Sequence, residues 1–180
     1  MLQITIPAME AWDEDKLEFV EYKEQTLLLE HSLIALSKWE SKWHKPFLTK
    51  QKKTPEETRY YIKCMTVTQN VSDDVYMRLT DDNMAQINKY IEDAMTATYF
   101  SENNRGKGSP EQTTAELIYY WMIALGIPFD CEKWHLNKLI TLIRVCSIKN
   151  APKKKMTNRD IWSQNAALNA ARKQKLHTRG

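Results

Sequence analysis

The chain has 180 residues, of which 42% are hydrophobic and 27% charged, and it contains only 4 glycines. This composition excludes a collagen-like, low-complexity or wholly disordered chain, and a fold of this length can bury roughly 70% of the surface that the unfolded chain exposes. No stretch approaches the roughly 18 to 20 apolar residues of a membrane helix and no secretory signal is visible, so we expect a cytosolic protein.

The net charge of +3 is distributed unevenly along the chain. Residues 1–30 hold eight acidic residues and two lysines, which gives −6, whereas residues 151–180 hold eight basic residues and one aspartate, which gives +7. Such polarity can support head-to-tail self-association or recruitment of a charged partner, or it can serve solubility alone. We therefore expect a possible homo-oligomer formed through the acidic N-terminal and basic C-terminal segments.

The N-terminal segment has the two-residue alternation of β-strands. Residues 2–6, 17–22 and 26–31 each alternate apolar with polar side chains or are rich in β-formers. The simplest arrangement is a three-stranded antiparallel meander in which Trp12-Asp13-Glu14-Asp15 form an acidic first loop. A helix over residues 14–29 is the alternative, because Glu, Lys and Leu are good helix formers.

From Ser32 onward the apolar residues follow a helical period. Helices are predicted in four segments: Ser32 to a point before Pro46, Thr54-Pro55 onward, residues 73–79, and Thr80 or Asp81 to Glu92. The second start is the clearest, since a capping threonine precedes a proline and two glutamates. Residues 95–100 are predicted to form a short strand or an extended connector.

The following segment contains few apolar residues and then many. Residues 101–108 hold two of the glycines and no apolar side chain, so they read as a surface loop, and their spacing is not that of a phosphate-binding loop. Ser109-Pro110-Glu111 resembles a helix start, and residues 117–125 are apolar nearly all round, which predicts a helix buried on several sides.

Gly126 suits the left-handed position after that helix, and a second helix follows with a broad apolar face between Trp134 and Cys146. The two helices are expected to form an antiparallel hairpin at the centre of the domain. The residues predicted to lie in the core are Leu117, Trp121, Leu125, Trp134, Leu139 and Ile143.

Residues 151–180 are basic and rich in alanine, and a cap at Thr157 or Asn158 predicts a final helix. Its apolar stripe is thin, so we expect it to fold against a partner rather than in isolation. The predicted partner-binding residues are Lys153, Lys154, Lys155, Arg159, Ile161, Trp162, Leu168, Arg172, Lys173 and Lys175. The predicted organisation is therefore one α+β, mainly α, domain over residues 1–150, with a β meander and a bundle of about five helices, followed by a basic helical arm over residues 151–180.

The search for catalytic chemistry is negative. Cys131 and His135 are four residues apart, a spacing that two zinc ligands on one helical face can have, but no second Cys/His pair supplies the further ligands that a zinc site needs. A core thiol beside a hydrogen-bonded histidine explains them better, and the three cysteines are expected to be reduced core thiols. The acid pairs at 73–74 and 81–82 fall where helix caps are expected. We therefore predict no catalytic, cofactor or metal site, and no enzyme.

Nucleic-acid binding is a weaker alternative. Basic clusters at 153–155 and 172–175 bracket the last predicted helix, and lysine-rich arms bind phosphates by releasing counterions. The rest of the chain is nearly balanced in charge and contains no zinc finger or RNA-recognition sheet. A nucleic-acid partner is thus unexpected, although the sequence leaves it open.

Several stretches resemble small proteins of tailed bacteriophages. They are Leu29-Glu30-His31-Ser32-Leu33, Ser37-Lys38-Trp39-Glu40-Ser41-Lys42-Trp43, Tyr119-Tyr120-Trp121-Met122-Ile123-Ala124-Leu125 and Trp134-His135-Leu136-Asn137-Lys138-Leu139-Ile140-Thr141-Leu142-Ile143. Together with the opening strand and its acidic loop, they make the chain similar to the tail assembly chaperones of long-tailed, siphovirus-type phages. The resemblance spans nearly the whole chain, and it is one of texture rather than of a catalytic signature.

The resemblance implies a non-enzymatic role in virion morphogenesis. Proteins of this group act in the cytoplasm of the bacterial host, where they coat the long tape-measure protein, keep it soluble and recruit tail-tube proteins before leaving the finished tail. The alternative is a structural virion protein, such as a head-tail connector or minor capsid component, that uses the C-terminal arm as a permanent clamp. A DNA-binding phage protein is the third class.

Overall fold

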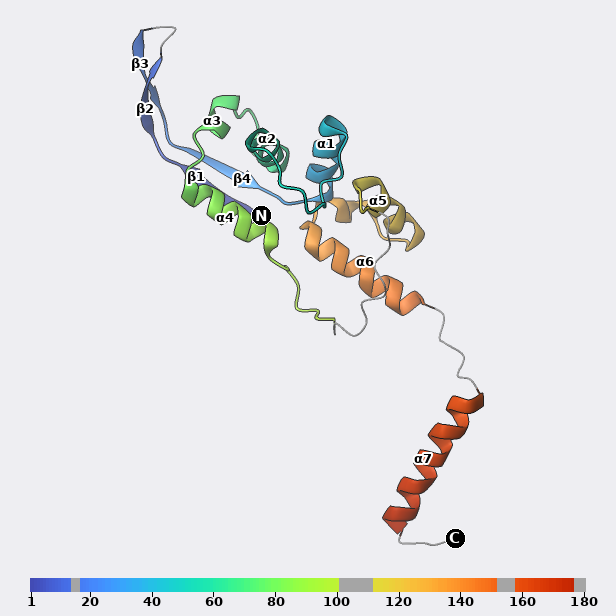
Figure 1. Ribbon diagram of the computed structural model, residues 1–180. Coiled ribbons are helices and arrows are strands. Elements are labelled where there is room, and N and C mark those ends of the chain that lie inside the picture. The colour runs from blue at the N-terminus through green and yellow to red at the C-terminus, as the bar shows by residue number, and fades with distance from the viewer. Residues whose placement is uncertain (14–16, 101–111, 152–157, 177–180) are drawn as a thin grey trace. The chain divides into compact units, whose positions relative to one another are not determined.

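The computed structural model describes residues 1–13, 17–100, 112–151 and 158–176. The chain divides into two compact units, Met1–Ser147 and Ile148–Gly180. Unit 1 combines two antiparallel strand pairs with a larger set of helices (Figure 1), which confirms the predicted α+β, mainly α, class.

The four strands form a long hairpin that is interrupted halfway. β1 (Leu2–Ile6) pairs with β4 (Gln25–Leu29), and β2 (Met9–Asp13) pairs with β3 (Glu18–Tyr22), both antiparallel. The arrangement is not the expected three-stranded meander, and no helix covers residues 17–29. Residues 9–13, part of which was expected to be a loop, are a strand. Pro7 lies at the break between β1 and β2, where its missing N–H cannot contribute to a ladder.

The first two helices begin where their capping residues predict. α1 (Leu33–Trp43) starts after Ser32, whose Oγ accepts a hydrogen bond from the Ala35 backbone N–H. α2 (Pro55–Met65) starts after Thr54, which forms a reciprocal capping box with Glu57. Two N-terminal N–H groups that lack intrahelical partners are thereby satisfied.

The next two helices are also confirmed. They are α3 (Asp73–Met77) and α4 (Asp81–Glu92), and α4 begins with a capping box between Thr80 and Asn83. Residues 95–100 form no strand, so they are the connector rather than the strand of the two expectations.

The prediction of an antiparallel helical hairpin at the centre of the domain is wrong, because the first of its two helices packs against α1 rather than along the second. α5 (Ala115–Ala124) begins after Thr114, downstream of the expected start at 109–111, which lies outside the described residues. Gly126 adopts the predicted left-handed conformation with φ of 65°. A 3₁₀ turn, η2 (Phe129–Lys133), precedes α6 (Leu136–Asn150). Because of that turn, Cys131 and His135 do not share the face of one helix.

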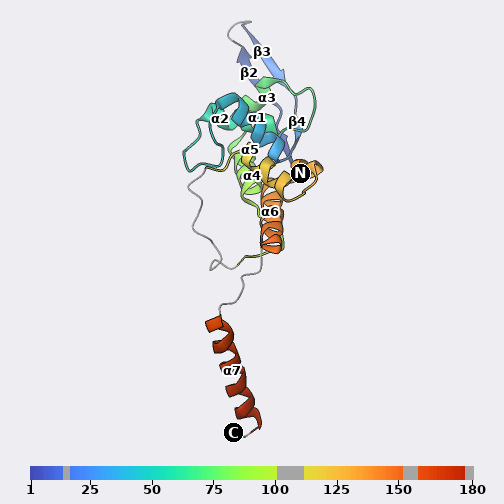
Figure 2. The ribbon, with the colours of Figure 1, turned by 90° about the vertical axis from the view of Figure 1, so that its right-hand side faces the viewer.

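The core lies between the β1–β4 pair and the helices. The buried face of this pair presents Ile4, Ile6, Leu27 and Leu29, and α4 packs on β1. α1 is the central helix, since it packs against α2, α5 and η2 (Figure 2). Of the six predicted core residues Leu139 and Ile143 are buried, Leu117, Trp121 and Leu125 are half-buried, and Trp134 is exposed.

The expectation that α5 is buried on several sides is wrong. Only Ala115, Ile118 and Met122 are fully buried, and they lie three to four residues apart on one side of the helix. Tyr120 and Ile123, on the opposite side, are 62% and 65% exposed. The apolar residues of this segment therefore lie on two sides of the helix, one that packs in the core and one that faces outward.

The second unit contains α7 (Asn158–Leu176), a helix of 19 residues. Every side chain of α7 whose exposure is described is exposed. The helix follows from its run of alanines and the absence of Gly and Pro, since these are the strongest intrinsic preferences for and against a helix.

Candidate partner-binding surfaces

α7 carries seven of the ten residues predicted to bind a partner. Those seven are Arg159, Ile161, Trp162, Leu168, Arg172, Lys173 and Lys175, and all are exposed. The predicted site at Lys153, Lys154 and Lys155 lies outside the described residues. Trp162 is the largest apolar side chain of the helix and is 78% exposed.

Some of the apolar and basic side chains of α7 share one side of the helix, whereas Trp162 and Lys173 lie off that side. Ile161 and Leu168 are seven residues apart, and Arg172 follows Leu168 by four, which places all three on the same side. Lys175 and Leu176 continue this stripe toward the C-terminal end. The stripe thus offers hydrophobic contact and positive charge to the same partner surface.

A second exposed surface is the β2–β3 hairpin, which was not predicted as a site. Trp12 lies opposite Phe19 in the strand register, and their rings meet edge to face with centroids 5.1 Å apart. These side chains are 50% and 71% exposed. The sequence signal was the acidic content of this segment, but Trp12 had been placed in a loop, so its cross-strand partner was missed.

The hairpin meets the rest of unit 1 through its base. The guanidinium group of Arg78 lies over the ring of Tyr22, with its central carbon 4.6 Å from the centroid. Beyond this contact the β2–β3 pair extends past α3 in both views (Figures 1 and 2). Two strands by themselves are only marginally stable, so a partner that covers their exposed aromatic side chains would stabilise the hairpin.

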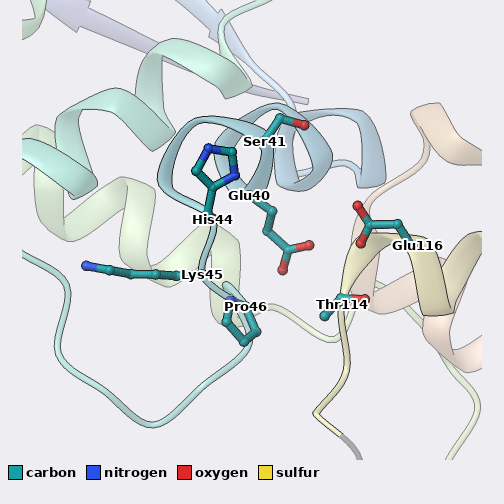
Figure 3. A pocket seen from close by; sticks show the side chains of 7 residues that line it. All are labelled: Glu40, Ser41, His44, Lys45, Pro46, Thr114 and Glu116. Atoms are coloured by element: carbon teal, nitrogen blue, oxygen red, sulfur yellow. The ribbon is translucent and has the colours of Figure 1, made fainter.

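A hollow beside the end of α1 contains a carboxylate that serves the fold. It is lined by Glu40, Ser41, His44, Lys45, Pro46, Thr114 and Glu116 (Figure 3). The Glu40 carboxylate accepts hydrogen bonds from the backbone N–H groups of Phe47 and Ala115, both at 2.7 Å. Glu40 therefore ties α1 to the loop that follows it and to the start of α5. Each of its two oxygens is therefore engaged with a backbone donor, and the bonds hold three segments together.

Two buried histidines meet at the junction of several elements. The rings of His31 and His135 have centroids 5.0 Å apart. His31 Nδ1 lies 2.6 Å from the Tyr61 hydroxyl, and His135 Nε2 donates to the Tyr90 carbonyl at 3.0 Å. Burial, and then the charge that His135 can carry, lower the pKa of His31 from 6.5 to about 3. Burial therefore favours the neutral form of His31, and the two rings form a polar connection inside the core.

The cysteines and acids do not assemble into a metal centre within the described residues. No group of three or more His, Cys, Asp or Glu side chains there is arranged to hold an ion. Cys131 is buried and free, as expected of a core thiol, while Cys64 and Cys146 are free and half-buried. The acids of the pairs at 73–74 and 81–82 lie in the first turns of α3 and α4, where the helix dipole favours negative charge.

Comparisons with known proteins identify no related protein. No protein-family model, no curated protein and no solved structure matches the chain. Among the helices of the described residues, none is both long and apolar enough to cross a membrane.

Proposed function

We propose that this protein is a non-enzymatic tail assembly chaperone of a long-tailed phage, which binds the tape-measure protein and promotes assembly of the tail tube. The observation that carries the proposal is α7, a helix of 19 residues with no buried side chain among those described. A helix gains most of its stability from tertiary packing, so an unpacked helix with Trp162 on its surface is suited to a partner. The resemblance to tail assembly chaperones supplies the identity of that partner.

The chemistry of α7 suits repeated weak binding. Its charged groups attract an acidic surface at a distance, but this attraction is screened beyond about 8 Å at physiological salt. Ile161, Trp162 and Leu168 supply the short-range apolar contacts, and bulky aromatic side chains commonly carry most of the energy of an interface. Several copies bound along one long tape-measure protein would gain from avidity even if each contact is modest.

The proposal is tested by co-expressing the full chain with the tape-measure protein of the same genome. Tagged wild-type chain should keep the tape-measure protein soluble and co-purify with it, and Trp162→Ala should reduce the captured amount more than any single lysine substitution in α7. Tyr99→Ala is the matched control, because Tyr99 is also an exposed aromatic residue but belongs to the connector after α4. Equal capture by wild type and Trp162→Ala would contradict a role for α7.

The same full chain separates the proposed chaperone from its alternatives. A chaperone should be absent from purified virions, whereas a connector or minor capsid protein should be present in stoichiometric amount by mass spectrometry. Binding to DNA that weakens steeply with salt, together with no capture of the tape-measure protein, would favour the DNA-binding alternative.

A further inference from the structure

We infer that the exposed face of the β2–β3 hairpin binds α7 of a second copy of this chain, so that copies associate head to tail. This goes beyond the proposed function, because it assigns the hairpin an occupant that is neither a tape-measure protein nor a tube subunit. Three features carry the inference: the side chains on one hairpin face, their charge, and the matching stripe of α7.

The first feature is a face that combines two carboxylates with an aromatic pair. Side chains two residues apart on a strand point to the same side, so Glu10 shares a face with Trp12 on β2. Across the ladder Glu10 lies opposite Glu21, and Trp12 lies opposite Phe19. The face therefore presents an apolar patch with two negative charges beside it.

The second feature is a pair of like charges that destabilises the hairpin when no partner is bound. Like charges directly opposite each other on neighbouring strands are destabilising, and neither Glu10 nor Glu21 has an ion-pair partner among the described residues. Residues 9–22 hold six acids and one lysine, a net charge of −5. A cation placed between the two glutamates would relieve this repulsion, so the hairpin is suited to a basic partner.

The third feature is the spacing of α7. Residues 158–176 hold four basic residues and one aspartate, a net charge of +3. Leu168 and Arg172 lie on one side of the helix and are about 6 Å apart along its axis, at 1.5 Å per residue. Trp12 and Glu10 are about 7 Å apart along their strand, at 3.4 Å per residue. Leu168 can thus contact the aromatic pair while Arg172 approaches the two carboxylates.

Each copy carries both halves of this pairing, the acidic hairpin and the basic helix. An interface between different surfaces of identical chains is heterologous, so it either leaves one free half at each end of an open assembly or closes into a ring. The association should therefore rise with concentration, and it proceeds beyond a dimer unless two copies exchange their helices reciprocally. Docking of α7 on the hairpin of its own chain would instead give a monomer at every concentration.

The test is sedimentation of the full-length chain over a range of concentrations, with charge-reversed variants. Wild type should form growing assemblies at low salt and lose them near 1 M salt, where the Debye length is about 3 Å. Glu10→Lys with Glu21→Lys, the hairpin-reversed chain, should weaken association at least tenfold. Arg172→Glu with Lys175→Glu, the helix-reversed chain, should do the same.

Mixing supplies the decisive measurement. The hairpin-reversed chain presents two cations on the hairpin face to a basic helix, and the net charge of its residues 9–22 changes from −5 to −1. The helix-reversed chain keeps the acidic hairpin, and the net charge of its residues 158–176 changes from +3 to −1. Each should fail to associate alone, and the two should associate with each other. The matched control is Glu92→Lys with Asp130→Lys, which makes the same change of charge at exposed positions outside the hairpin and should associate as wild type does.

Circular dichroism of each variant confirms that its fold is retained before association is compared. A wild type that stays monomeric at low salt overturns the inference. So does a hairpin-reversed chain that associates like wild type, a control that loses association equally, or a mixture of the two reversed chains that remains monomeric.

Discussion

At the residue scale, the buried polar side chains stabilise the fold by joining elements that are distant in the sequence. Glu40 accepts two backbone N–H groups from segments distant in the sequence, and Asn83 donates from α4 to the carbonyl of Thr5 on β1. His31 and His135 are buried against each other, and the described residues provide no carboxylate partner in hydrogen-bond contact with either ring. Burying a polar group costs free energy unless the group is hydrogen-bonded, so the loss of any one of these bonds should lower the free energy of unfolding of unit 1.

The histidine pair predicts a specific pH dependence of stability. His31 has a pKa of about 3 in the folded chain, against 6.5 in the unfolded chain, so the unfolded state takes up the proton first as pH falls. The stabilisation is complete above pH 6.5 and is lost progressively from pH 6.5 down toward 3. The free energy of unfolding measured by urea denaturation should fall by up to about 1.4 kcal/mol per pH unit in this range from this group alone.

Two variants isolate this effect. His31→Gln should be less stable near neutral pH. Its free energy of unfolding should fall less steeply between pH 6.5 and 4.5 than that of the wild type, because the titrating group is gone. Glu57 affects the pH dependence of the free energy of unfolding only below the range used for His31, because its hydrogen bonds to Lys45 and to Thr54 lower its pKa from 4.5. His44→Asn, at an exposed left-handed position that Asn tolerates, should keep the wild-type slope. An unchanged slope in His31→Gln would show that His31 is not the group responsible.

Leu139 tests the core at the same scale. Its side chain has no exposed surface, so Leu139→Ala should lower the free energy of unfolding by about 2 to 5 kcal/mol through lost burial and a cavity. Leu48→Ala is the matched control, since Leu48 is exposed and its truncation should cost well under about 1 kcal/mol. Chemical denaturation of both variants gives the comparison, and equal losses would exclude Leu139 from the core.

At the element scale, helix starts were predictable because capping is a local property of a few consecutive residues. Ser32, Thr54 and Thr80 each cap the helix expected from them. The helix that contains residues 117–124 starts after Thr114, and residues 112–114 before it are not helical, whereas its start was predicted at Ser109-Pro110-Glu111, which lies outside the described residues. Composition alone does not decide between two capping candidates in one segment.

The strand pairing and the exposed side of α5 depended on information that is not local. Which strand pairs with which is set by tertiary packing and not by alternation, so a meander and a long interrupted hairpin were indistinguishable in the sequence. Both sides of α5 carry apolar residues, so the sequence has no helical periodicity that would indicate which side faces the core. The hairpin surface was missed for the first of these reasons, whereas partner binding by the residues of α7 stays a prediction.

At the scale of the whole molecule, the chain consists of a unit with its own core and a helix without one. Met1–Ser147 contains every buried apolar residue of the described chain, and α7 contributes none. Apolar burial contributes about 25 cal/mol per Å² to stability, so a helix that buries no apolar side chain adds little to the free energy of folding of unit 1. Stability and partner binding should therefore be separable in this protein.

A truncation ending at Asn150 tests this separation. The truncated chain should keep the melting temperature of the full chain, and its far-UV circular dichroism should lose only the helical signal of α7. It should also lose both self-association and capture of the tape-measure protein, because the residues from Ile161 to Lys175 that are proposed to make these contacts are gone. The matched full-length control is Trp162→Ala, which should melt like wild type and still lose capture. A truncated chain that unfolds, or that melts several degrees lower, would show that the arm belongs to the folded core. Retention of binding after truncation would place the partner site on unit 1, where the exposed side chains of Tyr120 and Ile123 on α5 offer the next surface to test.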